Sequence, residues 1–179
     1  MKEIQEKLKS WRINRNMQNN TFIVDVEASN IIEECAEFLR AKNDNERIDA
    51  LCDISVFSIN SLHYLNSYCK GIRVYYRNHN YTIFDILENI SKFEKQNKND
   101  LISLLDEIIT FSCVITENMG YNYKECMLET IKEISSRKQD ATQKKEWEQN
   151  GVSGKWQKDK SQDKRTLYKA DYEKCKIRR

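Results

Sequence analysis

Proline is absent from the 179-residue chain, and glycine occurs only four times. Because these two residues mark most hairpins and tight loops, their scarcity argues against a sandwich, a barrel or a many-stranded sheet. Long apolar runs are also absent, so the sequence predicts no membrane-spanning helix. The charged start, MKEIQEKLKSW, has no apolar segment typical of a secretory signal. We therefore expect an all-α helical bundle in the cytoplasm.

Histidine is scarcer than glycine, with only His63 and His79 in the chain. The six cysteines show neither CxxC nor CxxxC spacing, which makes a zinc site unexpected. Without an export signal, free thiols in a reducing compartment are the better interpretation. Neither histidine has a serine or cysteine partner at a recognisable spacing, so we do not expect nucleophilic catalysis.

Charge is unevenly distributed along the chain. Residues 1–136 carry 16 basic and 21 acidic residues, whereas residues 137–179 carry 14 basic and 7 acidic residues. The acidic body and basic tail indicate that the tail either meets an anion or is a solvated arm.

Apolar residues recur with helical periodicity in most of the chain. Near Lys42–Asn45 a polar break predicts a tight turn between two helices. Beyond Lys138 the periodicity fades into a basic, less regular tail. The helices that we expect span residues 2–11, 26–41, 46–68, 82–96, 101–118 and 123–136.

Acidic residues flank the predicted turn at matching distances. Glu34 and Glu37 are spaced i, i+3, and Asp49 and Asp53 are spaced i, i+4, so each pair shares one face of its helix. With the turn centred on Asn43, Glu37 and Asp49 both lie roughly 9 Å from it, and Glu34 and Asp53 lie roughly 13.5 and 15 Å away. Folding of this hairpin brings four carboxylates toward one small volume.

Four converging carboxylates repel one another, so they either take up protons or bind cations. Oxygen ligands without histidine or cysteine favour a hard divalent ion, Mg²⁺ or Mn²⁺. The alternative is that these side chains are simply solvated, as most acidic residues on helices are. Burial of the adjoining Cys35, Leu51 and Cys52 would favour the metal site.

The carboxylate pattern resembles that of the MazG-like, all-α nucleoside triphosphate pyrophosphohydrolases, which carry EExxE on one helix and ExxD on the next. Glu33-Glu34-x-x-Glu37 matches the first half. In the second half Ala50 stands three residues before Asp53, and we take Asp49 as the stand-in for the missing acid. Glu46-x-x-Asp49 also fits ExxD, but it lies nearer the turn.

A second resemblance covers residues 119–176, which are similar to the C-terminal part of phage-encoded members. Residues 66–118 are a possible insertion relative to the smallest members. The domains that we expect are a helical catalytic domain at 1–138 and a basic extension at 139–179, packing on or over the site.

The resemblance implies cleavage of a nucleoside triphosphate, often a deoxy one, between the α and β phosphates. The products are a nucleoside monophosphate and pyrophosphate. Glu34, Glu37, Asp53 and Asp49 would hold Mg²⁺ ions that activate a water. Glu33 points about 100° away from the Glu34/Glu37 face. It is therefore solvated, or it orients a metal ligand without touching the metal, or it acts as the base for the water.

Several further residues are candidates for contacts with the substrate. Basic side chains in the tail would clamp the triphosphate, or are simply exposed. Trp11 either stacks on the base or packs in the core, and Asn30 would touch the sugar or orient Glu34. The substrate-binding candidates are Trp11, Asn14, Arg15, Asn30, Arg137, Lys138, Lys155 and Lys158.

A two-helix hairpin with a carboxylate face cannot bury its own apolar faces, so we expect a homodimer or homotetramer. Two alternatives to the enzyme are a nucleic-acid-binding protein that uses residues 137–179 and a non-enzymatic interaction protein. The acidic body makes nucleic acid the less expected partner. The tail resemblance favours a phage-encoded protein in a bacterial host.

Overall fold

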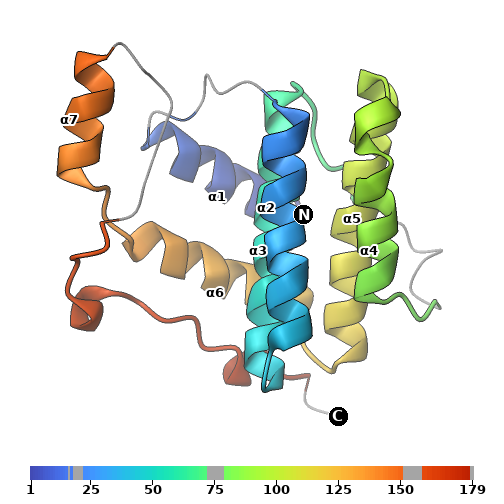
Figure 1. The fold of residues 1–179 in the computed structure, drawn as a ribbon. Coiled ribbons are helices and arrows are strands. Elements are labelled where there is room, and N and C mark those ends of the chain that lie inside the picture. The colour runs from blue at the N-terminus through green and yellow to red at the C-terminus, as the bar shows by residue number, and fades with distance from the viewer. Residues whose placement is uncertain (16, 18–21, 72–78, 151–158, 178–179) are drawn as a thin grey trace.

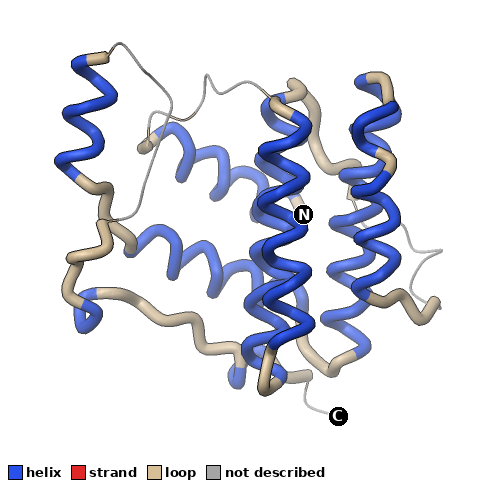
Figure 2. The backbone as a smooth tube through the Cα atoms, viewed as in Figure 1, coloured by secondary structure: helices blue, strands red, loops and turns tan. Residues whose placement is uncertain are grey.

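A computed structural model describes residues 1–15, 17, 22–71, 79–150 and 159–177 of the chain. Within these ranges the regular structure is helical, with isolated bridges such as Tyr121–Lys176 but no β-strand (Figure 2). The predicted all-α fold is therefore confirmed. The α-helices are α1 (Lys2–Ile13), α2 (Val24–Arg40), α3 (Asp44–Tyr64), α4 (Ile83–Ser91), α5 (Lys98–Asn118), α6 (Tyr123–Ser136) and α7 (Ala141–Gln149).

Helices α2 to α5 stand side by side as a four-helix bundle (Figure 1). The antiparallel pair α2 and α3 forms one half, and α4 and α5 pack against it. Helices α1 and α6 run across one side of this bundle, where both contact α3. Residues 159–177 run beneath α6 to the lower ends of α2 and α3 (Figure 1).

The turn between α2 and α3 is set by local hydrogen bonds. Asn43 caps α3, because its Oδ1 accepts from the backbone N–H of Glu46 at 3.0 Å. The Glu46 carboxylate accepts from the backbone N–H of Lys42 at 2.7 Å and from Asn43 Nδ2 at 2.9 Å. Glu46 is thus used by the turn, in the manner of a capping box.

The core is centred on α3 and α5. Both helices are buried around most of their circumference, which explains why their sequences are apolar or small on several faces. Ile48, Leu51 and Cys52 on α3 are fully buried, as is Cys35 on α2. No helix in the described residues is long and apolar enough to cross a membrane.

Residues 66–118 contribute half of the bundle. Helices α4 and α5 come from this stretch, and their fully buried residues include Ile86, Leu105 and Ile108. The stretch that we expected as a possible insertion is therefore an integral part of the bundle.

Helix α7 was not predicted. Its sequence, ATQKKEWEQ, has almost no apolar periodicity. The available signal was Asp140, whose Oδ1 accepts from the backbone N–H groups of Thr142 and Gln143 at 2.9 and 3.0 Å. An aspartate directly before a run of helix-forming residues marks a helix start.

Candidate functional site

The candidate site is the carboxylate face of the α2–α3 hairpin. Glu34 on α2 and both Asp49 and Asp53 on α3 are partly buried, whereas Glu37 is exposed. The charges of Asp53, Glu37 and Asp49 each act on Glu34, in that order of strength. The two helices therefore place four acidic side chains within electrostatic reach of one another.

Two of these carboxylates have strongly raised pKa values. Burial, followed by repulsion from Asp53, raises the pKa of Glu34 to about 8. Burial, followed by repulsion from Asp49, raises the pKa of Asp53 to about 7. In the absence of a cation, the hairpin thus favours protonated acids near neutral pH.

Helix α6 adds an ion pair to this face. Arg137, the residue directly after α6, donates from Nη2 to Glu133 Oε1 at 2.9 Å. Burial alone would lower the pKa of Arg137, but Glu133, Asp53 and Asp49 more than offset this effect. Arg137 in turn lowers the pKa values of Asp49 and Asp53, so one cation balances part of the acidic face.

Arg15 and Trp11 hold the C-terminal end of α6. Arg15 Nη2 donates to the carbonyl oxygens of Ile134 and Arg137 at 3.0 and 3.1 Å. The indole N–H of Trp11 donates to the same Ile134 carbonyl at 3.3 Å, and the Arg15 guanidinium lies 4.7 Å from the Trp11 ring centre. A cation that satisfies the last carbonyls of a helix stabilises that end and fixes its position. Both predicted residues therefore support Arg137.

Tyr172 connects the C-terminal segment to the acidic face. Its hydroxyl donates to Asp49 Oδ1 at 2.6 Å and lies 3.0 Å from Thr130 Oγ1. Tyr172 is 4% exposed, and burial raises the pKa of its hydroxyl, which keeps it protonated as a donor. Burial raises the pKa of Asp49 as well, and the Tyr172 hydrogen bond opposes that rise.

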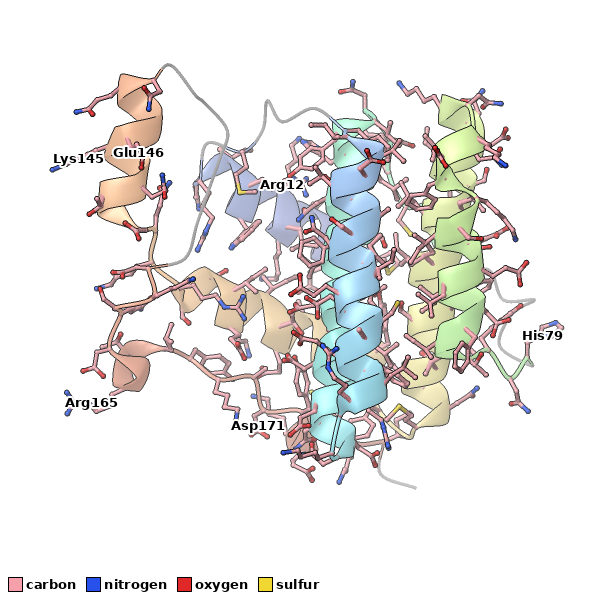
Figure 3. The ribbon with its side chains drawn as sticks, in the orientation of Figure 1. Arg12, His79, Lys145, Glu146, Arg165 and Asp171 are labelled. Atoms are coloured by element: carbon pink, nitrogen blue, oxygen red, sulfur yellow. The ribbon has the colours of Figure 1, made fainter. Side chains whose placement is uncertain are left out.

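Two glutamates of α6 anchor the rest of this segment. Glu129 accepts hydrogen bonds from Tyr168 and from the backbone N–H of Asp171, and it pairs with Lys174 at 2.9 Å. Glu133 Oε2 accepts from the backbone N–H of Ala170 at 2.9 Å. The segment, with Asp171 labelled in Figure 3, therefore packs along α6 toward the lower ends of α2 and α3.

The remaining predicted residues are more dispersed. Asn14 is exposed and lines an open groove of about 880 Å³ between α1 and α6, together with Trp11 and Arg15. Asn30 is partly buried on α2, one turn before Glu34, and Glu33 is exposed on the neighbouring face.

Lys138 is exposed, and Gln162 Oε1 accepts from its backbone N–H at 2.7 Å. Lys155 and Lys158 lie outside the described residues.

Glu133 and Tyr172 belong to the site but were missed. Glu133 stands four residues before Arg137, and this i, i+4 spacing is a signal for an ion pair on one helix. Tyr172 lies 123 residues from Asp49 in the chain. Only the return of the C-terminal segment brings Tyr172 and Asp49 together, and no local sequence pattern predicts this contact.

The donor set suits a hard cation, although the carboxylates do not surround a common point. Among the described residues, no three histidine, cysteine, aspartate or glutamate side chains are gathered closely enough to hold a metal ion. All four carboxylates of the α2–α3 face offer oxygen ligands, which Mg²⁺ and Mn²⁺ prefer.

Comparison of the chain with protein-family models, with curated proteins and with solved structures gives no match.

Proposed function

We propose that the chain is a Mg²⁺-dependent nucleoside triphosphate pyrophosphohydrolase, which cleaves a (d)NTP between the α and β phosphates to give a (d)NMP and pyrophosphate. The observation that carries this proposal is the acidic face of the α2–α3 hairpin. Burial and mutual repulsion raise the pKa of Glu34 to about 8 and that of Asp53 to about 7. Carboxylates whose pKa values are strongly raised by burial and by one another are candidates for a functional site.

A divalent cation would relieve this repulsion. Because these carboxylates do not surround a common point in the structure, the side chains of Glu34, Glu37 and Asp53 would turn toward the ion to hold it. Asp49 would be a fourth ligand or an acid that stays bonded to Tyr172. When bound, Mg²⁺ supplies charge neutralisation at the phosphates and lowers the pKa of a bound water.

Residues of this chain would bind and orient the triphosphate. Glu133 accepts a hydrogen bond from the Arg137 guanidinium, and Arg15 donates to the Arg137 backbone carbonyl. The guanidinium offers a planar set of donors for a phosphate. Lys138 is exposed beside it. Trp11 and Asn14 would meet the base from the α1–α6 groove, and Asn30 would touch the sugar or orient Glu34.

Exposed apolar residues on α2 support the expected homodimer or homotetramer. Ile32 and Leu39 are 46% and 53% exposed. Their spacing of seven residues puts them on one face of the helix. A second copy that packs on this face would bury it. A cytoplasmic, phage-encoded enzyme remains part of the proposal.

The test is hydrolysis of a panel of canonical and modified (d)NTPs with Mg²⁺ or Mn²⁺, with products identified by ³¹P NMR. We expect signals of a nucleoside monophosphate and pyrophosphate from at least one triphosphate, and none in EDTA. Products that consist of a diphosphate and inorganic phosphate would contradict the α–β cleavage. Hydrolysis of none of the panel would favour the non-enzymatic interaction protein.

A further inference from the structure

A second cavity, of about 580 Å³, lies between α1, the C-terminal end of α3 and the loop that follows α3. Its wall is fixed by hydrogen bonds. The Gln5 side-chain amide donates to the Cys69 carbonyl at 3.1 Å and accepts from the Cys69 backbone N–H at 3.0 Å. The backbone N–H of Lys70 donates to Asp106 Oδ1 at 3.0 Å. The cavity is therefore formed by the fold itself.

Arg12, labelled in Figure 3, lies where α1 meets the bundle and lines this cavity. It is 2% exposed, and its Nη1 donates to the neutral side chain of Asn60. No ion pair to Arg12 is found in the described part of the chain, and its Nε has no hydrogen-bond partner there. A buried cation that has no anionic partner is costly, and binding of an anion would remove much of that cost.

The other charges that line the cavity are mostly positive. Lys2, Lys9 and Lys70 line it with Arg12, against the single carboxylate of Glu6. Burial, followed by the charges of Arg12 and Lys9, lowers the pKa of His63, so these three side chains lie within electrostatic reach of one another. The lining thus provides a positive field for a ligand with more than one negative charge.

We propose that this cavity binds a small phosphomonoester, whose dianionic phosphate pairs with Arg12 and with Lys9 and Lys70 at the rim. With Nη1 on Asn60, the edge formed by Nε and Nη2 is the part of the guanidinium that can bind a phosphate with two hydrogen bonds. The cavity is larger than a phosphate ion, and the apolar side chain of Ile59 in its lining can contact an organic group.

This site is separate from the carboxylate face. Asp49 and His63 lie fourteen residues apart on α3, which corresponds to roughly 21 Å along the helix. None of the four carboxylates of the α2–α3 face lines the cavity. Binding here does not depend on the proposed hydrolase activity, and either proposal can fail without the other.

The test is titration of the full chain with inorganic phosphate in EDTA, by calorimetry and by ¹H–¹⁵N NMR, against chloride at the same ionic strength. We expect saturable binding that shifts the amide signals of Gln5, Cys69 and Lys70. Shifts confined to the α2–α3 hairpin, or acetate binding as tightly as phosphate, would overturn the proposal.

Substitution of two exposed lysines of α1 tests the site without changing the core. Lys9 lines the cavity, whereas Lys7 lines the groove on the other side of the same helix, and both are exposed. We expect Lys9→Gln to raise the Kd for phosphate about fivefold, and Lys7→Gln to change it less than about twofold. Arg12→Gln is expected to raise it at least about 30-fold. Equal effects of Lys9→Gln and Lys7→Gln would mean non-specific attraction and would refute the site.

Discussion

At the scale of single residues, one hydroxyl group joins the C-terminal segment to the acidic face. Tyr172 donates to Asp49 and is held in turn by Thr130, whose own hydroxyl lies 3.1 Å from the Cys126 carbonyl oxygen. This contact fixes the orientation of Asp49, one of the four carboxylates of the α2–α3 face. A group that orients a ligand influences the site without touching the substrate.

Tyr172→Phe removes this hydroxyl and keeps the ring. We expect the free energy of unfolding to fall by about 1 kcal/mol, and the proposed Mg²⁺-dependent activity to fall roughly tenfold. Urea unfolding and a pyrophosphate release assay measure the two effects. Tyr168→Phe is the control, since its hydroxyl bonds to Glu129 and not to a facing acid. An equal loss of activity in both variants would show that Tyr172 acts only through stability.

At the scale of elements, α6 organises both the site and the C-terminal segment. Glu129 is 2% exposed and serves several donors of that segment. Burial raises the pKa of this carboxylate, but hydrogen bonds from Lys132, Lys174 and Tyr168 outweigh the effect and lower the pKa to about 2. The ionised form is therefore part of the folded structure.

Glu129→Gln is expected to lower the free energy of unfolding at pH 7 by about 2 kcal/mol. Because the folded-state pKa of Glu129 lies below its unfolded value, wild type loses this contribution as the pH falls from about 4.5 to 2. Urea titrations at several pH values measure the difference. The exposed Glu125 of the same helix supplies the control, and Glu125→Gln should stay within about 0.5 kcal/mol of wild type. A pH-independent cost of Glu129→Gln would contradict the role of its charge.

The elements themselves were largely predictable from the sequence. Apolar periodicity located the first six helices, because each buries one face or most of its surface. Helix α7 lacks that signal and was missed. The carboxylate pairs could be placed on one face from spacing alone, but Glu133 and Tyr172 could not, because their positions depend on how α6 and the chain end cross the hairpin.

At the scale of the whole molecule, the acidic face sets how stability depends on pH. The folded-state pKa values of Glu34 and Asp53, about 8 and 7, lie above the usual values of 4.5 and 3.8 for these side chains. At pH values between the usual and the raised pKa of each acid, the folded chain binds more protons than the unfolded chain. The free energy of unfolding therefore falls as the pH rises through this range. His63, whose pKa burial lowers below the usual 6.5, acts in the opposite direction.

In EDTA, the free energy of unfolding should fall by on the order of 3 kcal/mol between pH 5 and pH 8. Addition of Mg²⁺ at pH 8 should restore much of it, because the proposed ion binds only the folded face. Glu34→Gln removes one of the two raised acids and should flatten the profile. Stability that rises steadily from pH 5 to pH 8 in wild type would contradict the repulsion.

The most direct measurement is Mg²⁺-dependent pyrophosphate release by wild type, Asp53→Asn and Asp25→Asn. Asp25 is an exposed residue of α2 and serves as the matched control. We predict that Asp53→Asn remains folded and loses at least about 100-fold in kcat/KM, whereas Asp25→Asn retains the wild-type value. Equal rates for wild type and Asp53→Asn, with any triphosphate that wild type hydrolyses, would contradict the assignment of the α2–α3 face as the catalytic site.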